Sequence, residues 1–78
     1  MTARVVYSRR AAAEAEVIEA YLAKHSARAA VQFREALERA ERQLSAFPDS
    51  GVPGIRPGTR HLVVGAYIVS YRRRDADV

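Results

Sequence analysis

Arginine side chains that could bind anions are concentrated in the last third of the chain. Residues 51–74 contain five arginines and no acidic residue: Arg56, Arg60, Arg72, Arg73 and Arg74. Guanidinium groups bind phosphates and carboxylates through paired, charge-assisted hydrogen bonds. If the two ends of this region meet, the arginines form a surface that favours a polyanion or an acidic protein. The alternative is a solvated basic edge that discourages strand-to-strand aggregation.

Histidine is the other residue type here that could move protons, and the chain has two. His61 lies among the arginines, so a phosphoryl-cleaving site would use Arg60, His61 and Arg72, with arginine stabilising phosphate charge. A partly exposed strand histidine is the simpler interpretation. His25 is expected at a helix end. With no second histidine or acid close to His61 in sequence, and no cysteine, we expect no metal site and no cofactor.

The length and composition indicate one small domain spanning residues 1–78, with a net charge of +4. A chain of this size buries only about 60% of its unfolded surface, so a partner that binds the folded form adds useful stability. The longest wholly apolar run has four residues, against the roughly 20 that a membrane helix needs. We therefore expect no membrane span, and the absence of a secretory signal and of cysteine favours a cytoplasmic location.

The first half of the chain is predicted to form a strand and two helices. Arg4–Ser8 is β-branched and aromatic, which is typical of a strand. Ser8 can cap a helix over Arg10–Lys24, and Ser26 can cap a second one. This second helix has the clearest apolar pattern: Ala30, Phe33, Leu37, Ala40, Leu44 and Phe47. Because the connection between the helices is short, they should form an antiparallel hairpin with this stripe in the core.

The second half is predicted to be a loop followed by a β-hairpin. Pro48 ends the helix, and residues 49–58 are rich in glycine and proline. Two strands, Thr59–Val64 and Tyr67–Arg72, flank a Gly65-Ala66 turn. In the resulting register one side carries the larger apolar groups and meets the helices. The other side is amphipathic and open, and it consists of His61, Val63, Ile68, Ser70 and Arg72.

The order and spacing of these features resemble the RelE/ParE toxins of bacterial type II toxin–antitoxin systems, closest to the ParE-like branch. The likeness covers essentially the whole chain. It rests on Pro48, Gly51, Pro53-Gly54, Gly58-Thr59-Arg60, Leu62-Val63-Val64 and Tyr67-Ile68-Val69-x-Tyr71-Arg72. The resemblance implies an α+β fold in which an antiparallel sheet packs against a helical hairpin, in the order β-α-α-β-β.

The resemblance also implies a toxin that a cognate antitoxin neutralises, in a hetero-oligomer. ParE-like members inhibit DNA gyrase, whereas RelE-like members cut messenger RNA in the ribosome. We expect this chain to be a gyrase inhibitor, that is, a protein-binding toxin rather than an enzyme. The alternative is a ribosome-dependent endoribonuclease. A third hypothesis is an inactive remnant that only binds an antitoxin. The residues expected to bind target or antitoxin are Arg56, Arg60, Val63, Ile68, Arg72, Arg73 and Arg74. Family members usually continue past the position of Val78 with a further strand, so we expect the family's final strand to be missing.

Overall fold

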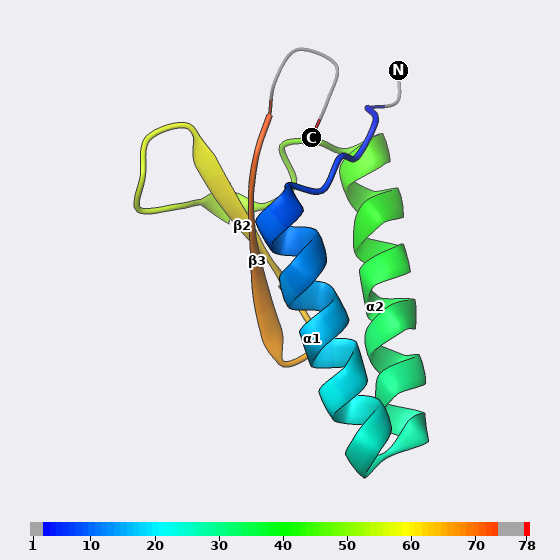
Figure 1. The fold of residues 1–78 in the computed structure, drawn as a ribbon. Helices are drawn as coiled ribbons and strands as arrows, with labels where there is room; N and C mark the ends of the chain where they lie inside the picture. The colour runs from blue at the N-terminus through cyan, green and yellow to red at the C-terminus, as the bar shows by residue number, and fades with distance from the viewer. Residues whose placement is uncertain (1–2, 74–77) are drawn as a thin grey trace.

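The computed structural model describes residues 3–73 and 78. Its two helices have serine N-caps, Ser8 and Ser26. Each serine hydroxyl accepts a hydrogen bond from the backbone N–H three residues later, so each caps one helix as predicted. The helices are α1 (Arg9–His25) and α2 (Ala27–Ala46). They run antiparallel and form a hairpin that lies against one face of a sheet (Figure 1).

The predicted β-hairpin is confirmed in its bounds and its register. It consists of β2 (Thr59–Val64) and β3 (Tyr67–Arg72), paired from Val64↔Tyr67 to Thr59↔Arg72. Gly65 opens the two-residue turn with φ 60°, a conformation that glycine adopts without steric cost. The antiparallel register therefore alternates side chains between the helix side and the open side, as the sequence predicted.

A short additional strand, β1 (Val52–Pro53), lies in the segment that was predicted to be only a loop. It pairs antiparallel with β2 and gives the sheet order β1-β2-β3. Proline cannot donate to a ladder, but an edge strand tolerates it. Two residues are too few to show the alternating pattern of a strand, and β1 forms only because it pairs with β2. Sequence periodicity therefore did not predict it.

The N-terminal strand predicted over residues 4–8 does not join this sheet, and the observed order is α-α-β-β-β. This corrects the predicted β-α-α-β-β order, although the α+β class is confirmed. The segment instead exchanges backbone hydrogen bonds with the last residue. The Val6 N–H donates to the Val78 carbonyl at 2.7 Å, and the Val78 N–H donates to the Arg4 carbonyl at 2.8 Å.

The core lies between α2 and the sheet. Phe33 and Leu44 of the predicted stripe are buried, together with Val64 of β2, and the Phe33 ring packs edge-on against Tyr67 with centroids 5.3 Å apart. Phe47 was predicted to extend the stripe but is 68% exposed. The reason is that Phe47 is the C-cap of α2, where the chain leaves the helical path.

A second apolar cluster joins the two ends of the described chain. Ala3, Leu44 and Val78 are buried together, and Val5, Leu62 and Tyr71 pack around them. Neither described helix is long and apolar enough to cross a membrane.

Candidate protein-binding face of the sheet

Arg60 is held against the loop that follows α2. Its Nη1 donates to the Gly51 carbonyl at 2.8 Å and to the Asp49 carbonyl at 3.2 Å. Its Nε lies 3.9 Å from Asp49 Oδ1. The guanidinium of Arg60, predicted from sequence to bind phosphate, therefore contacts two backbone carbonyls and a carboxylate of the protein itself.

Tyr71 holds the same loop from the neighbouring strand. Its hydroxyl accepts from the Gly51 N–H at 2.9 Å and donates to the Pro48 carbonyl at 2.9 Å. Gly51 is buried, and a Cβ there would lie 2.7 Å from both the His61 carbonyl and the Tyr71 ring. The backbone of residues 48–51 is thus fixed to the sheet by two cross-strand partners, Arg60 and Tyr71.

Asp49 is the residue of this region that the sequence analysis missed. Arg73 Nη1 donates to Asp49 Oδ2 at 3.0 Å, so Arg60 and Arg73 both approach this carboxylate. Asp49 lies just before the acid-free residues 51–74. Only the folding of the loop places its carboxylate close to the arginines. Arg74 lies outside the described residues.

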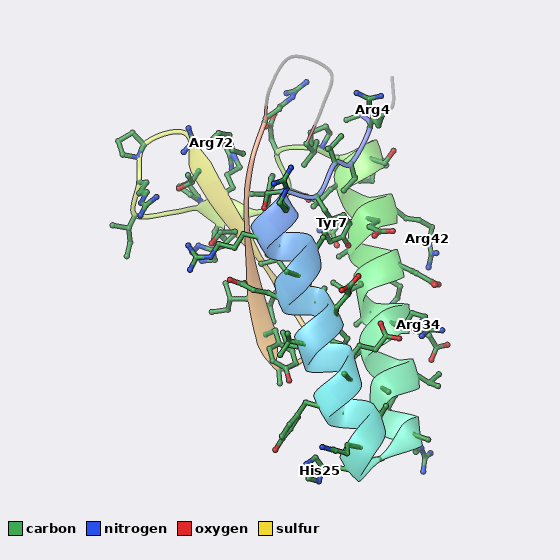
Figure 2. The ribbon with its side chains drawn as sticks, in the orientation of Figure 1. Arg4, Tyr7, His25, Arg34, Arg42 and Arg72 are labelled. Carbon is green, nitrogen blue, oxygen red and sulfur yellow. The ribbon has the colours of Figure 1, made fainter. Side chains whose placement is uncertain are left out.

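The open face of the sheet consists of the residues that the predicted register placed there. Arg72 is exposed at the end of the hairpin that is remote from the Gly65 turn (Figure 2). His61 lies opposite Ser70 on one side and Val52 on the other, and it is half-buried between them. Arg72 and His61 thus share a face, whereas Arg60, one residue away from His61, is turned to the other side.

The part of this face nearest the Gly65 turn is apolar. Val63 and Ile68 are cross-strand partners that are 69% and 68% exposed. Val52 on β1 is also exposed, and Ile55 in the next loop is fully exposed beside the exposed Arg56. We call the surface formed by the strand residues of this side the outer face; its members are Val52, His61, Val63, Ile68, Ser70 and Arg72.

The chemical inventory of the site is limited. Within the part of the chain that the structure describes, no group of three or more His, Cys, Asp or Glu residues could hold a metal ion. The proposed phosphoryl-cleaving set is divided, because Arg60 binds the loop while His61 and Arg72 are on the outer face. The outer face combines exposed apolar side chains with the cationic Arg72, a composition that is typical of protein-interaction surfaces.

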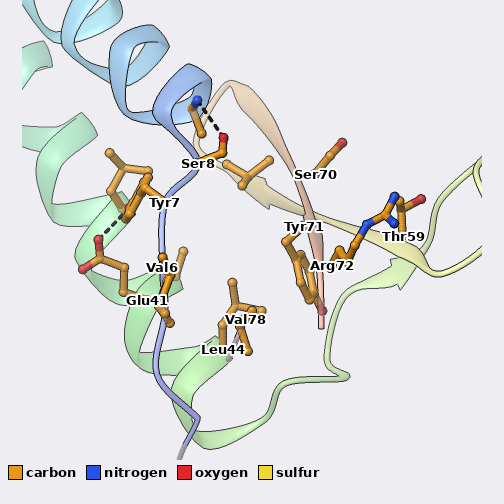
Figure 3. Close-up of a pocket in the computed structure, with 15 residues that line it drawn as sticks. Val6, Tyr7, Ser8, Glu41, Leu44, Thr59, Ser70, Tyr71, Arg72 and Val78 are labelled. Atoms are coloured by element: carbon orange, nitrogen blue, oxygen red, sulfur yellow. Dashed lines mark hydrogen bonds between the residues drawn. The ribbon is translucent and has the colours of Figure 1, made fainter. Parts of the chain in front are cut away.

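A groove on the helix side, between the N-terminal segment and β3, was not foreseen from the sequence (Figure 3). At its edge the Tyr7 hydroxyl donates to Glu41 Oε1 at 2.6 Å. Burial raises the pKa of Tyr7 above its ordinary value, and the hydrogen bond and the negative charge of Glu41 raise it further. The phenol therefore stays protonated well into the alkaline range and continues to donate to Glu41.

One family of known proteins matches this chain over nearly all of its length. The sequence model of the ParE toxin of type II toxin-antitoxin system, parDE, matches residues 5–78. Searches of curated proteins and of solved structures found no match. The match agrees with the α+β architecture and with the resemblance carried by the loop and hairpin residues. The chain therefore belongs to the ParE toxin family and is the toxin component of a type II toxin–antitoxin system, with an antitoxin as its partner.

Proposed function

We propose that this toxin inhibits DNA gyrase by binding it through the outer face of the sheet. The observation that carries the proposal is the exposed Val63–Ile68 pair at the turn end of that face, with the exposed Arg72 on the same face at the other end of the hairpin. The family match supports a ParE-like toxin. Arg60 and Arg72 lie on opposite sides of the sheet, and this separation supports a binding protein rather than an enzyme.

The energetics of association support binding at this surface. Covering an exposed apolar pair gains free energy because its surface is removed from water, at about 25 cal/mol per Å². Arginine is enriched among the residues that dominate binding energy, and positive charge accelerates encounter with an acidic partner. The side chains of Val63 and Ile68 point away from the core, so a partner can cover them without disturbing the fold.

The RelE-like alternative is a ribosome-dependent endoribonuclease that uses Arg60, His61 and Arg72. It draws less support from the site, because Arg60 donates to the carbonyls of Asp49 and Gly51. His61 and Arg72 then remain as the only members of the set on the outer face. Codon-positioned cutting of ribosome-bound messenger RNA, lost in Arg72→Ala, would establish this alternative.

A gyrase assay with the purified 78-residue chain tests the proposal. We expect inhibition of supercoiling and accumulation of gyrase–DNA cleavage complexes, which are released when the antitoxin is added. Unaltered supercoiling at a large molar excess of folded toxin, verified by circular dichroism, would contradict it. We further propose that the toxin works in the cytoplasm, where gyrase and the antitoxin are present, and that toxin and antitoxin form a hetero-oligomer.

A further inference from the structure

The loop between β1 and β2 presents the most exposed large apolar side chain of the described residues. Ile55 is 103% exposed, whereas the other exposed large hydrophobic residues in that part of the chain are 39–69% exposed. In Figure 1 this loop projects from the side of the sheet that faces away from the helices, which is also the side of the outer face. We call residues 54–58 the tip loop.

Hydrogen bonds at its base hold the tip loop in place. The Gly54 N–H donates to the Thr59 carbonyl at 2.8 Å and closes the loop. The Thr59 N–H donates to the Arg56 carbonyl at 3.1 Å, and the Thr59 hydroxyl donates to the same carbonyl at 2.6 Å. A single exposed apolar residue is common on protein surfaces, but Ile55 is presented by a loop that is fixed on both sides of it.

The residues of the tip loop favour this arrangement. The bond from Thr59 to Arg56 closes a four-residue turn with Pro57 and Gly58 at its centre. A type II turn favours proline at the first central position and requires a positive φ at the second, and Gly58 has φ 81°. The β-branched side chain of Ile55 has few rotamers. Binding of a side chain presented in this way therefore loses little conformational entropy.

The surroundings of Ile55 are cationic. Arg56 follows it directly, and Arg72 is the cross-strand partner of Thr59, the residue that closes the tip loop. Both arginines are exposed, and neither forms an ion pair with another described residue. Carboxylates of a partner can therefore bind them through charge-assisted hydrogen bonds.

The other described arginines at this end of the sheet do not extend the cationic surface. Arg60 and Arg73 both approach the carboxylate of Asp49, which offsets part of their charge. Nucleic-acid binding draws its affinity from many phosphate contacts, and two unpaired guanidinium groups offer few. An exposed aliphatic side chain with two cations beside it fits a protein pocket that is apolar inside and acidic at its rim.

We propose that Ile55 inserts into an apolar, acidic-rimmed pocket of gyrase, as an anchor separate from the Val63–Ile68 pair. Four residues of β2 separate Val63 from the tip-loop end of the strand, a distance of about 13 Å. A partner seated on the outer face also meets the tip loop, because both lie on the side of the sheet away from the helices (Figure 1). The inference rests on the proposed function, since gyrase supplies the pocket.

Equilibrium binding of the 78-residue chain to purified, DNA-free gyrase tests this anchor. Ile55→Ser removes the apolar group and should weaken binding by about 10- to 100-fold. Because Ile55 is fully exposed, this variant should keep the wild-type melting temperature. Ile55→Val keeps a branched apolar side chain and should weaken binding by about fourfold or less.

A charge series and a matched control accompany these variants. Arg56→Glu should weaken binding more than Arg56→Gln, because an acidic rim repels the new carboxylate. The difference between the two should shrink as the salt concentration rises. Val31→Ser removes an exposed valine of α2 and should bind gyrase like the wild type.

Three outcomes would overturn the inference, and they are distinguishable. If Ile55→Ser bound like the wild type while Val63→Ser/Ile68→Ser bound more weakly, the tip loop would be no anchor and the proposed function would stand. If the folded wild-type chain neither bound nor inhibited gyrase, the proposed function would fail and the pocket with it. If the wild type bound only in the presence of DNA, or bound a DNA duplex alone in a manner that Ile55→Ser abolished, nucleic acid would be the ligand of the tip loop.

Discussion

Arg60 and Tyr71 face each other across β2 and β3, and both side chains hold the backbone of residues 48–51. The guanidinium donates to the Gly51 carbonyl while the phenol accepts from the Gly51 N–H. Both polar groups of one buried glycine are thus satisfied by two neighbouring strands. This contact ties the end of α2 to the sheet and positions β1 beside β2.

The Tyr71 hydroxyl should contribute measurably to stability. Tyr71→Phe removes two hydrogen bonds and leaves the Gly51 N–H and the Pro48 carbonyl without this partner. We expect a loss of about 1–3 kcal/mol in the free energy of unfolding, measured by urea denaturation. Tyr67→Phe, whose ring packs on Phe33, is the control and should change stability by less than about 0.5 kcal/mol. Equal effects of the two substitutions would refute the role given to the hydroxyl.

Two arginines of the predicted cluster should behave differently. Arg60→Ala removes charged donors to the Gly51 and Asp49 carbonyls and should destabilise the fold by about 1–2 kcal/mol. Arg72→Ala, an exposed position, should change stability by less than about 0.5 kcal/mol while weakening the binding of gyrase. Thermal unfolding and binding are measured on both variants. If Arg60→Ala left the melting temperature unchanged, its assignment as a loop anchor would be wrong.

Gly51 should tolerate substitution less well than the nearby Gly54. A Cβ at Gly51 would lie 2.7 Å from the His61 carbonyl and from the Tyr71 side chain, both fixed by hydrogen bonds. The closest atom to a Cβ at Gly54 is the Thr59 hydroxyl, an exposed side-chain group whose displacement would lose only its hydrogen bond to the Arg56 carbonyl. We expect Gly51→Ala to cost about 1–3 kcal/mol and Gly54→Ala about 1 kcal/mol or less in denaturation experiments. The reverse order would contradict the close approach at Gly51.

The Tyr7–Glu41 contact predicts how stability depends on alkaline pH. Because the pKa of Tyr7 is raised in the folded chain above its ordinary 10.0, the unfolded chain loses this proton first. The stabilisation is complete below about pH 10 and is lost as the pH rises above that value. The free energy of unfolding, measured from pH 8 to 11, should fall more steeply for the wild type than for Tyr7→Phe.

Glu41→Gln is the control for this pH dependence. It removes the negative charge but keeps a hydrogen-bond acceptor and the burial of the phenol. Its slope should lie between those of the wild type and Tyr7→Phe. Identical alkaline slopes for all three proteins would exclude Tyr7 as the titrating group.

Local signals made much of the fold predictable from sequence. Ser8 and Ser26 cap the helices because a serine hydroxyl needs only the next turn of backbone. The Gly65-Ala66 turn fixes the register of the hairpin, and this register places Val63 and Ile68 on the same face. Each of these features is determined within a few residues of chain, or by a turn that defines its own strands.

The features that escaped prediction depend on contacts between distant segments. Arg60 was expected to be available for phosphate, but Asp49 and Gly51 reach it only after the loop folds back. The segment that was predicted to be an N-terminal strand forms backbone hydrogen bonds with Val78 and not with a strand of the sheet. The groove between the N-terminal segment and β3 arises from the same arrangement, so periodicity within any single segment could not reveal it.

The central claim is that the exposed Val63–Ile68 pair binds gyrase, and paired variants in a supercoiling assay test it most directly. Val63→Ser/Ile68→Ser removes the exposed apolar pair of the outer face, and Val17→Ser removes an equally exposed valine on α1. Both should remain folded. We predict that inhibition by the double variant falls at least about tenfold, equivalent to about 1.4 kcal/mol of binding, while Val17→Ser inhibits like the wild type. Full inhibition by the double variant, or equal losses in both, would contradict the account.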